Sequence, residues 1–208
     1  MKKISIITVL LCLSAGVLSA QGTGSLSSLY EKMTSSATSM DYSYSLLPSS
    51  GMKMTGDGSV TVQGNAYVMD ANGLEMYCDG RTVWVVDLEG KEILMETPAE
   101  GENAYLDNPA LLFVNMDEVF RIDGFRENGN AVTYLLSSKV ESGVRTASIT
   151  LDGSRNDPVI TSATFYLSDD SRLDIKIKSM TFSQKKPLTS FFYDISNLDS
   201  SWLITDLR

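Results

Sequence analysis

The sequence predicts a single, mainly β domain with a few helices, an α+β fold. From about residue 42 onward, short runs of alternating apolar and polar residues are separated by Gly-containing turns, the pattern of an antiparallel meander. Before them, residues 25–40 have apolar side chains at helical spacing. The 188 residues after residue 20 are enough for one domain with a substantial core, and no internal repeat marks a second one.

Residues 1–20 have the features of a secretory signal peptide. Two lysines supply the positive start, an apolar run follows, and small residues end at Ala20, after which we expect cleavage. The run is shorter than the roughly 20 apolar residues of a membrane-spanning helix. A lipid anchor at Cys12 is disfavoured because a lipobox has a small residue where this chain has Leu11. We therefore expect an exported, soluble domain over residues 21–208.

The stretch over residues 25–40 predicts one amphipathic helix. Ser25 is a suitable N-cap residue. Apolar residues recur at every third or fourth position, with Ser, Thr, Glu and Lys between them, so one side of the helix is apolar and is expected to cover a sheet. These residues are Leu26, Leu29, Tyr30, Met33, Ala37 and Met40.

A first group of strands is expected between residues 42 and 95. Tyr42, Tyr44 and Leu46 alternate with serines, and the following strands alternate in the same way. Tight turns such as Asn72-Gly73 and Asp79-Gly80 separate them, which is typical of an antiparallel meander. The apolar positions are Val60, Val62, Tyr67, Met69, Leu74, Met76, Cys78, the run 83–86, Ile93 and Met95.

Residues 103–120 interrupt the strands and predict a short helical segment. Asn108 has the character of a cap, and Pro109 follows it at the first helical position. The apolar residues after Pro109 would lie on nearly all sides of a helix, so we expect other parts of the protein to cover both sides of this segment.

A second group of strands is expected after Phe120. Regular alternation of apolar and polar residues in this part of the chain indicates strands with one buried and one solvent-exposed face. The runs are residues 131–138, 144–151, 159–167 and 172–182. Apolar residues between Phe191 and Ile204 predict one or two last strands.

Charge and residue content exclude several functions. The net charge is −9, and it becomes −11, with 15 basic against 26 acidic residues, once the two lysines of residues 1–20 are removed. Such a balance argues against partners that are nucleic acids or anionic membranes. The chain has no histidine, which excludes Ser-His-Asp and Cys-His sites and removes the commonest zinc ligand. Cys78 is the only cysteine after residue 20, so the mature chain cannot form an internal disulfide.

No motif predicts catalysis, a cofactor or a metal. Asp-Gly pairs begin at residues 57, 79, 123 and 152, and each lies between two strand-like runs, where such a pair is typical of a turn. Asp169, Asp170 and Asp174 lack the spacing of a calcium loop. The sequence also lacks a phosphate-binding glycine loop and a nucleophile elbow. We expect a protein without enzyme activity, cofactor or metal.

Methionine is prominent on the predicted strands. Nine methionines follow Met1, and those on strands include Met54, Met69, Met76 and Met95. This flexible side chain suits surfaces that fit apolar ligands of variable shape, but it also fills gaps in ordinary cores. Composition alone leaves both interpretations open.

Residues 74–87 read Leu-Glu-Met-Tyr-Cys-Asp-Gly-Arg-Thr-Val-Trp-Val-Val-Asp. This stretch resembles the Asp-Gly-Lys-Thr-Leu-Trp-x-Tyr hairpin of the periplasmic outer-membrane lipoprotein carriers, the LolA-type family. Its surroundings follow the family's order: a helix, an aromatic strand, a strand led by Gly58, the hairpin, and then Asn-Pro-Ala-Leu-Leu at residues 108–112. The resemblance covers nearly all of residues 21–208, with a generic pattern in the second half.

The resemblance implies an incomplete antiparallel β-barrel whose concave face is covered by helices that act as a lid. The apolar space between sheet and lid would take the acyl chains of a lipoprotein. Members of the family accept lipoproteins from an inner-membrane, ATP-driven release transporter and pass them to an outer-membrane receptor. The implied function is that of a periplasmic carrier, or chaperone, that ferries lipoproteins from the inner to the outer membrane. We expect it to be a monomer.

The expected lipid-binding residues lie on the concave side of this half-barrel. Alternation along the strands places Val60, Val62, Tyr67, Met69, Leu74 and Met76 there. The hairpin motif adds Trp84, and the expected lid adds Leu111 and Leu112. A register shift of one residue would turn a strand's whole set to the other face.

The sequence departs from the family pattern after the strand led by Gly58. The best-known members have a basic residue followed by Pro there, and an Arg helps to hold the lid shut. This chain has Gln63-Gly64-Asn65 instead, so closure of the lid by an Arg does not carry over.

Three other functions stay open on the sequence. One is a lipid-binding or envelope-stress-sensing module of the same fold without transfer activity. Another is an Asp-based hydrolase, which would need clustered, inward-facing carboxylates with raised pKa values. The third is a structural or adhesive β-sandwich, which would have a filled core.

Overall fold

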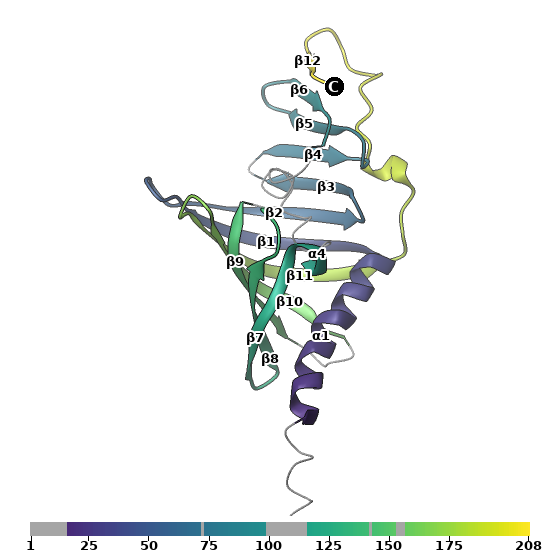
Figure 1. Cartoon of the computed structure of the whole chain (residues 1–208). Coiled ribbons are helices and arrows are strands. Elements are labelled where there is room, and N and C mark those ends of the chain that lie inside the picture. The colour runs from purple at the N-terminus through teal and green to yellow at the C-terminus, as the bar shows by residue number, and fades with distance from the viewer. Residues whose placement is uncertain (1–15, 72, 99–115, 142, 153–156) are drawn as a thin grey trace, which may run out of the picture.

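A twelve-stranded sheet and a long N-terminal helix make up most of the molecule (Figure 1). The computed structural model describes residues 16–71, 73–98, 116–141, 143–152 and 157–208. The helices are α1 (Gly16–Ser35), α4 (Met116–Val119) and the 3-10 helix η2 (Leu188–Phe191). The strands are β1 (Ala37–Leu47), β2 (Met54–Gln63), β3 (Ala66–Ala71), β4 (Leu74–Cys78), β5 (Val83–Asp87), β6 (Glu92–Glu96), β7 (Phe120–Asn128), β8 (Ala131–Ser138), β9 (Val144–Asp152), β10 (Val159–Leu167), β11 (Arg172–Ser183) and β12 (Leu203–Asp206).

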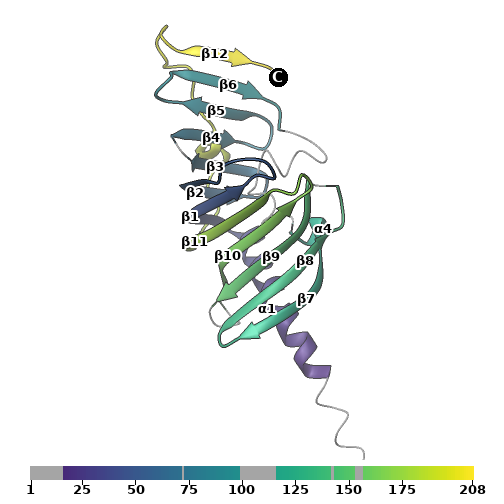
Figure 2. The ribbon, with the colours of Figure 1, turned by 90° about the vertical axis from the view of Figure 1, so that its left-hand side faces the viewer.

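Two antiparallel meanders join into this one sheet. β2 to β6 follow one another on one side of β1, and β11 back to β7 follow on the other side. β12 is added to the edge of β6 as a parallel strand. β12 and β7 therefore form opposite edges, and the described strands make an open, curved sheet rather than a closed barrel (Figures 1 and 2). The prediction of a mainly β, incompletely closed antiparallel fold is confirmed.

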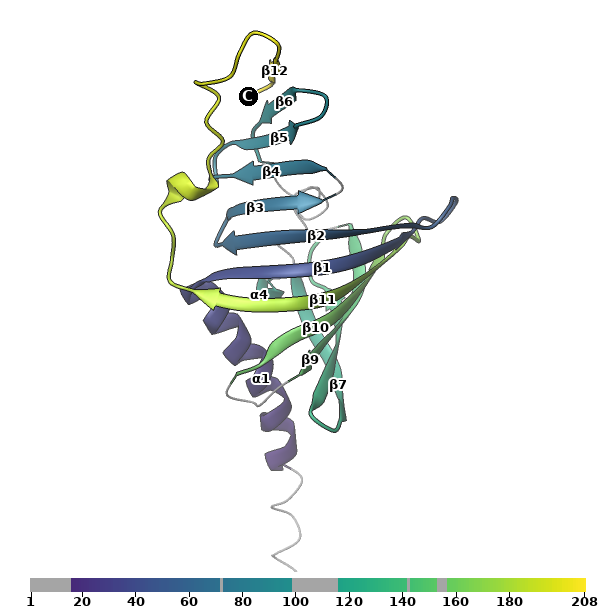
Figure 3. The same ribbon diagram turned by 180° about the vertical axis from the view of Figure 1, so that it is seen from behind.

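β1 is the strand on which both meanders meet. Its ladder with β11 runs from Ala37 opposite Ser183 to Leu47 opposite Arg172, with one register shift near its middle. Its other edge pairs with β2 over nearly its whole length. The shift is a bulge, which bends a strand and increases its local twist. The long, bent ladders beside β1 are visible from behind in Figure 3.

The predicted helix over residues 25–40 differs from the observed one at both ends. α1 already includes residues before Ser25, which lies buried inside it and is not its N-cap. At the other end, the hydroxyl of Ser36 donates to the carbonyl oxygen of Lys32 at 2.5 Å, and β1 begins at Ala37. The two strand ladders that β1 joins outweigh the helical spacing of its first residues, a long-range effect that overrides local propensity.

Most strand predictions are confirmed. The runs predicted at residues 131–138 and 159–167 coincide with β8 and β10, while β9 and β11 each extend one residue further. The first meander and one last strand, β12, are also present. The helical segment expected over residues 103–120 lies mostly outside the described residues, which contain only its end as α4. No helix among the described residues is long and apolar enough to span a membrane.

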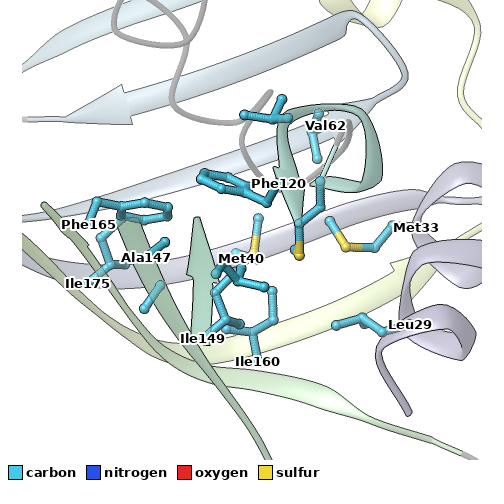
Figure 4. Close-up of a cluster of buried hydrophobic side chains, with 14 of the residues drawn as sticks. Leu29, Met33, Met40, Val62, Phe120, Ala147, Ile149, Ile160, Phe165 and Ile175 are labelled. Carbon is cyan, nitrogen blue, oxygen red and sulfur yellow. The ribbon is translucent and has the colours of Figure 1, made fainter. Parts of the chain in front are cut away.

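The main core lies on the face of the sheet against which α1 packs, which we call the inner face. Leu29 and Met33 of α1 are buried against strand residues such as Met40, Val62 and Phe165 (Figure 4). The same cluster continues through both meanders, from Val83 of β5 to residues of β8 and β9. A single apolar layer therefore joins the helix to both halves of the sheet.

A second, smaller cluster lies on the opposite face of β4 to β6, which we call the outer face. Its buried members are Trp84, Val86, Ile93 and Met95. The chain between β11 and β12 packs over them with Tyr193, Ile195, Leu198 and Trp202. The rings of Trp84 and Phe192 meet edge to face, with centroids 4.9 Å apart. The C-terminal segment thus packs on the sheet through an apolar cluster that is separate from the main core.

Gln63 fixes the start of that segment. Its side-chain amide donates to the carbonyl oxygen of Lys186 at 3.0 Å and accepts from the backbone N–H of Lys186 at 2.7 Å. The nitrogen and the oxygen of the Gln63 amide therefore both bind the backbone of Lys186. Gln63 thus holds the C-terminal segment against the end of β2.

Substituting Gly58 by Ala should destabilise the fold, because Tyr42 covers this glycine across the β1–β2 ladder. A Cβ on Gly58 would lie 2.6 Å from the Tyr42 ring and 2.7 Å from the carbonyl oxygen of Asp70. We expect the free energy of unfolding in urea to fall by about 1–3 kcal/mol. Gly124→Ala is the control, because a Cβ there meets nothing within 4 Å. Equal stability of the two variants would contradict this packing.

The outer-face cluster should give the protein a specific sensitivity to alkaline pH through Tyr77. Burial, followed by the hydrogen bond to Glu75 and the charge of that carboxylate, raises the pKa of Tyr77 from 10.0 to about 12. Because the folded-state pKa is the higher one, this stabilisation is complete below pH 10 and is lost as the pH rises toward 12.

Urea unfolding of wild type and Tyr77→Phe between pH 8 and pH 11.5 measures this effect. We expect the advantage of the wild type over the variant to shrink above pH 10, because Phe cannot ionise. A difference in the free energy of unfolding that stays constant over this pH range would show that folding does not raise the pKa of Tyr77.

Candidate functional site

The inner face of β1 to β4 has an apolar surface without charge. Strand pairing turns every second residue of these strands to the inner face, and none of those positions holds an acidic or basic residue. Several of them pack against the main core while remaining half-buried: Tyr42, Tyr44, Met69 and Met76. The charged residues of the same strands, such as Asp41, Asp57 and Asp70, lie on the outer face by the same alternation.

Six of the predicted lipid-binding residues come from β2, β3 and β4, and the structure brings five of them together. Val60, Val62 and Tyr67 are buried in the main core, and Met69 and Met76 pack against it. The sixth, Leu74, is 43% exposed at the start of β4 and does not join the cluster.

Trp84 does not lie where the hairpin motif was expected to place it. In β5, Val83 and Val85 belong to the inner face, whereas Trp84 belongs to the outer-face cluster. The register explains the difference, since Trp84 pairs with Tyr77 and with Met95, two other residues of that cluster. The predicted placement of Trp84 on the concave side is therefore corrected. The two predicted lid residues, Leu111 and Leu112, lie outside the described residues.

A pocket of about 360 Å³ lies between α1 and the β7–β8 edge of the same face. Its wall is mostly apolar, with polar and charged groups among the lining residues. The lining residues are Leu26, Ser27, Tyr30, Glu31, Met116, Phe120, Arg121, Ile122, Leu136 and Lys139. Helical spacing and strand alternation predict several of these residues as helix or strand positions, but no local pattern assigns them to a site, because only the tertiary fold brings α1 beside β7 and β8.

Two ionisable groups of the inner face, Cys78 and Tyr42, are kept neutral. Burial raises the pKa of the Cys78 thiol, and burial is also the largest cause of the raised pKa of Tyr42. The backbone N–H of Gly80, which donates to the Cys78 sulfur at 3.3 Å, lowers the pKa of the thiol but does not offset the effect of burial. Both groups therefore stay protonated at physiological pH, and the thiol is held as a packed, unreactive side chain.

This arrangement offers apolar surface to a ligand. The half-buried inner-face side chains of β1 to β4 carry neutral hydroxyl, thioether and hydrocarbon groups. Within the described part of the chain, no group of three or more His, Cys, Asp or Glu residues could hold a metal ion. The geometry therefore supports binding by burial of apolar surface, in which shape matters more than polar contacts.

Comparisons of the chain with known proteins find similarities in structure only. No protein-family model matches the sequence, and no curated protein matches it. Among solved structures, the chain is similar to a LolA superfamily protein from Nitrosomonas europaea at 11% identity, with a TM-score of 0.45, over 83% of this chain and 97% of that one.

Two other solved structures are similar over comparable lengths. A DUF1329 family protein from Desulfovibrio piger has 11% identity and a TM-score of 0.45, over 85% of this chain and 97% of that one. A putative outer membrane lipoprotein-sorting protein domain from Vibrio parahaemolyticus has 9% identity and a TM-score of 0.42, over 81% of this chain and 95% of that one. The similarity concerns the course of the chain, and the side chains of this protein decide what its inner face can bind.

Proposed function

We propose that the protein is a periplasmic carrier that shields the acyl chains of lipoproteins on its inner face and ferries them from the inner to the outer membrane. The observation that carries this proposal is the uncharged inner face of β1 to β4, on which Tyr44, Met69 and Met76 stay half-buried beside a packed core. A face of this kind has apolar surface left over after the fold has formed.

The energetics fit the task of a carrier. Each acyl CH₂ group that leaves water gains about 0.8 kcal/mol, so a lipoprotein cannot cross an aqueous compartment unless its chains are covered. Methionine and tyrosine adapt to chains of different length and kink, because they contact a ligand through a flexible thioether and a broad ring. Release then needs no specific polar bond to be broken.

The pocket between α1 and β7–β8 supports the same function. Its volume of about 360 Å³ lies at the lower end of ligand sites, which span roughly 300–1,000 Å³. It lies on the same face as the half-buried residues of β1 to β4, and α1 contributes Leu26 and Tyr30 to its wall. An acyl chain laid along the inner face could end in this pocket.

The remaining features belong to the same proposal. Residues 1–20 direct export, and an ATP-driven transporter and an outer-membrane receptor drive loading and unloading, as the resemblance to LolA-type carriers implies. The protein itself then performs no catalysis and works as a monomer. Lid closure does not use the family's Arg, because Gln63 at the corresponding stretch binds Lys186 instead.

Met69→Glu should weaken the binding of a fluorescent fatty acid by about tenfold or more, because a carboxylate beside an acyl chain must lose its hydration. Fluorescence titration of the processed protein measures the dissociation constant. Val68→Glu is the matched control, since Val68 is half-buried on the same strand but pairs with Tyr77 on the outer face. Met69→Leu should bind nearly as the wild type does.

Two outcomes would overturn or restrict this proposal. A wild-type protein that takes up no acyl probe, with Met69→Glu still folded by circular dichroism, would contradict acyl binding. Binding of the probe without release of lipoprotein from inner-membrane vesicles would leave a lipid-binding module of the same fold without transfer activity.

A further inference from the structure

The connection between β1 and β2 projects from the sheet with large apolar side chains in solvent. It extends beyond the neighbouring strands in two opposite views (Figures 1 and 3). Met52 is 87% exposed, Met54 is 51% exposed and Leu47 is 49% exposed. Single exposed apolar residues are ordinary, but several on one projecting tip form a patch of the kind that marks an interaction site. We call Leu47, Met52, Lys53 and Met54 the hairpin tip.

The hairpin tip also differs in charge from the rest of the protein. The whole chain has a net charge of −9, yet Lys53 is the only charged residue between Tyr42 and Gly56. The nearest acid along β2, Asp57, is paired with Lys178 at 2.6 Å. In the neighbouring β10–β11 turn, Asp170 is paired with Arg145 at 2.6 Å. The tip thus presents apolar groups and one cation. Of the carboxylates near it, Asp57 and Asp170 are paired with cations, and Asp169 accepts hydrogen bonds from Ser171.

Strand pairing holds the hairpin tip in place from both sides of β1. β1 is paired up to Leu46 opposite Met54 on one side and up to Leu47 opposite Arg172 on the other. The backbone N–H of Ser49 donates to the hydroxyl of Ser171 at 3.3 Å, which ties the turn to the β10–β11 connection. Exposure of the methionines is therefore set by the strands beneath them.

We propose that the hairpin tip docks the protein on a lipid bilayer by inserting Leu47, Met52 and Met54 into the boundary between headgroups and acyl chains. The tip projects from the sheet, and strand alternation turns Leu47 and Met54 to opposite faces. A protein partner would therefore need a deep socket around the tip, whereas a bilayer surrounds it without one. The Lys53 ammonium reaches the phosphate layer while its methylene stem stays among apolar groups. Because the rest of the protein is acidic, docking is strongest on membranes of low surface charge.

This docking is separate from acyl binding on the inner face. The hairpin tip lies at the far end of β1 from α1 and takes no part in the pocket between α1 and β7–β8. Docking holds the carrier at the surface from which a lipoprotein is taken or to which it is delivered.

Flotation with vesicles of phosphatidylcholine and phosphatidylethanolamine tests the proposal on the processed protein. We expect the wild type to float with the vesicles and the double variant Leu47→Asp/Met52→Asp to bind about tenfold less. Leu207→Asp is the control, because Leu207 is 65% exposed but lies beyond β12, away from the tip. All three proteins should bind the fluorescent fatty acid equally, which separates docking from acyl binding.

A dye attached at the tip gives a second readout. Met52→Cys can be labelled selectively with an environment-sensitive dye, since Cys78 is only 2% exposed. We expect its emission to shift to the blue on vesicles, and the same dye on Leu207→Cys to keep its emission. Equal flotation of wild type and double variant, equal shifts at both sites, or a tip-dependent dimer in place of vesicle binding would each overturn the proposal.

Discussion

The pairing of β1 with β11 holds the whole architecture together, because it is the seam between two meanders made from different parts of the chain. β2 to β6 are built by short-range hairpins, and so are β7 to β11. Only the ladder from Ala37 opposite Ser183 to Leu47 opposite Arg172 makes them one sheet. Closing this long loop costs entropy, which the long ladder and the apolar layer over Met40 offset together.

The seam also determines which residues lie on each face of the sheet. Once β1 is fixed between β2 and β11, its alternate residues set which side of both meanders meets α1. The inner face then collects Tyr42, Tyr44, Met69 and Met76 without a charge, while the outer face receives the C-terminal segment over Trp84. Apolar side chains thus stay half-buried on the inner face of β1 to β4, whereas the C-terminal segment covers the outer face of β4 to β6. The same strand carries the hairpin tip at its far end.

Alternation along the chain was enough to predict most strands and the inner position of residues such as Val60 and Met69. It failed where local pattern is ambiguous or a distant segment decides. Residues 83–86 are apolar at every position, so the sequence does not tell the faces of β5 apart; the C-terminal segment makes the face of Trp84 an outer one. Pairing with β11 likewise turned the predicted end of the helix into strand. The pocket beside α1 depends on a tertiary contact that no local pattern encodes.

Photo-crosslinking with a fatty acid that carries a diazirine on its chain tests most directly whether the inner face binds acyl chains. The protein would be illuminated with the bound probe, digested, and the labelled residues identified by mass spectrometry. Acyl binding on the inner face predicts labels on Tyr44, Met69 and Met76 and on the Leu26 region of α1, all competed by unlabelled fatty acid. Labels confined to the outer face around Trp202, or no competed label at all, would contradict it.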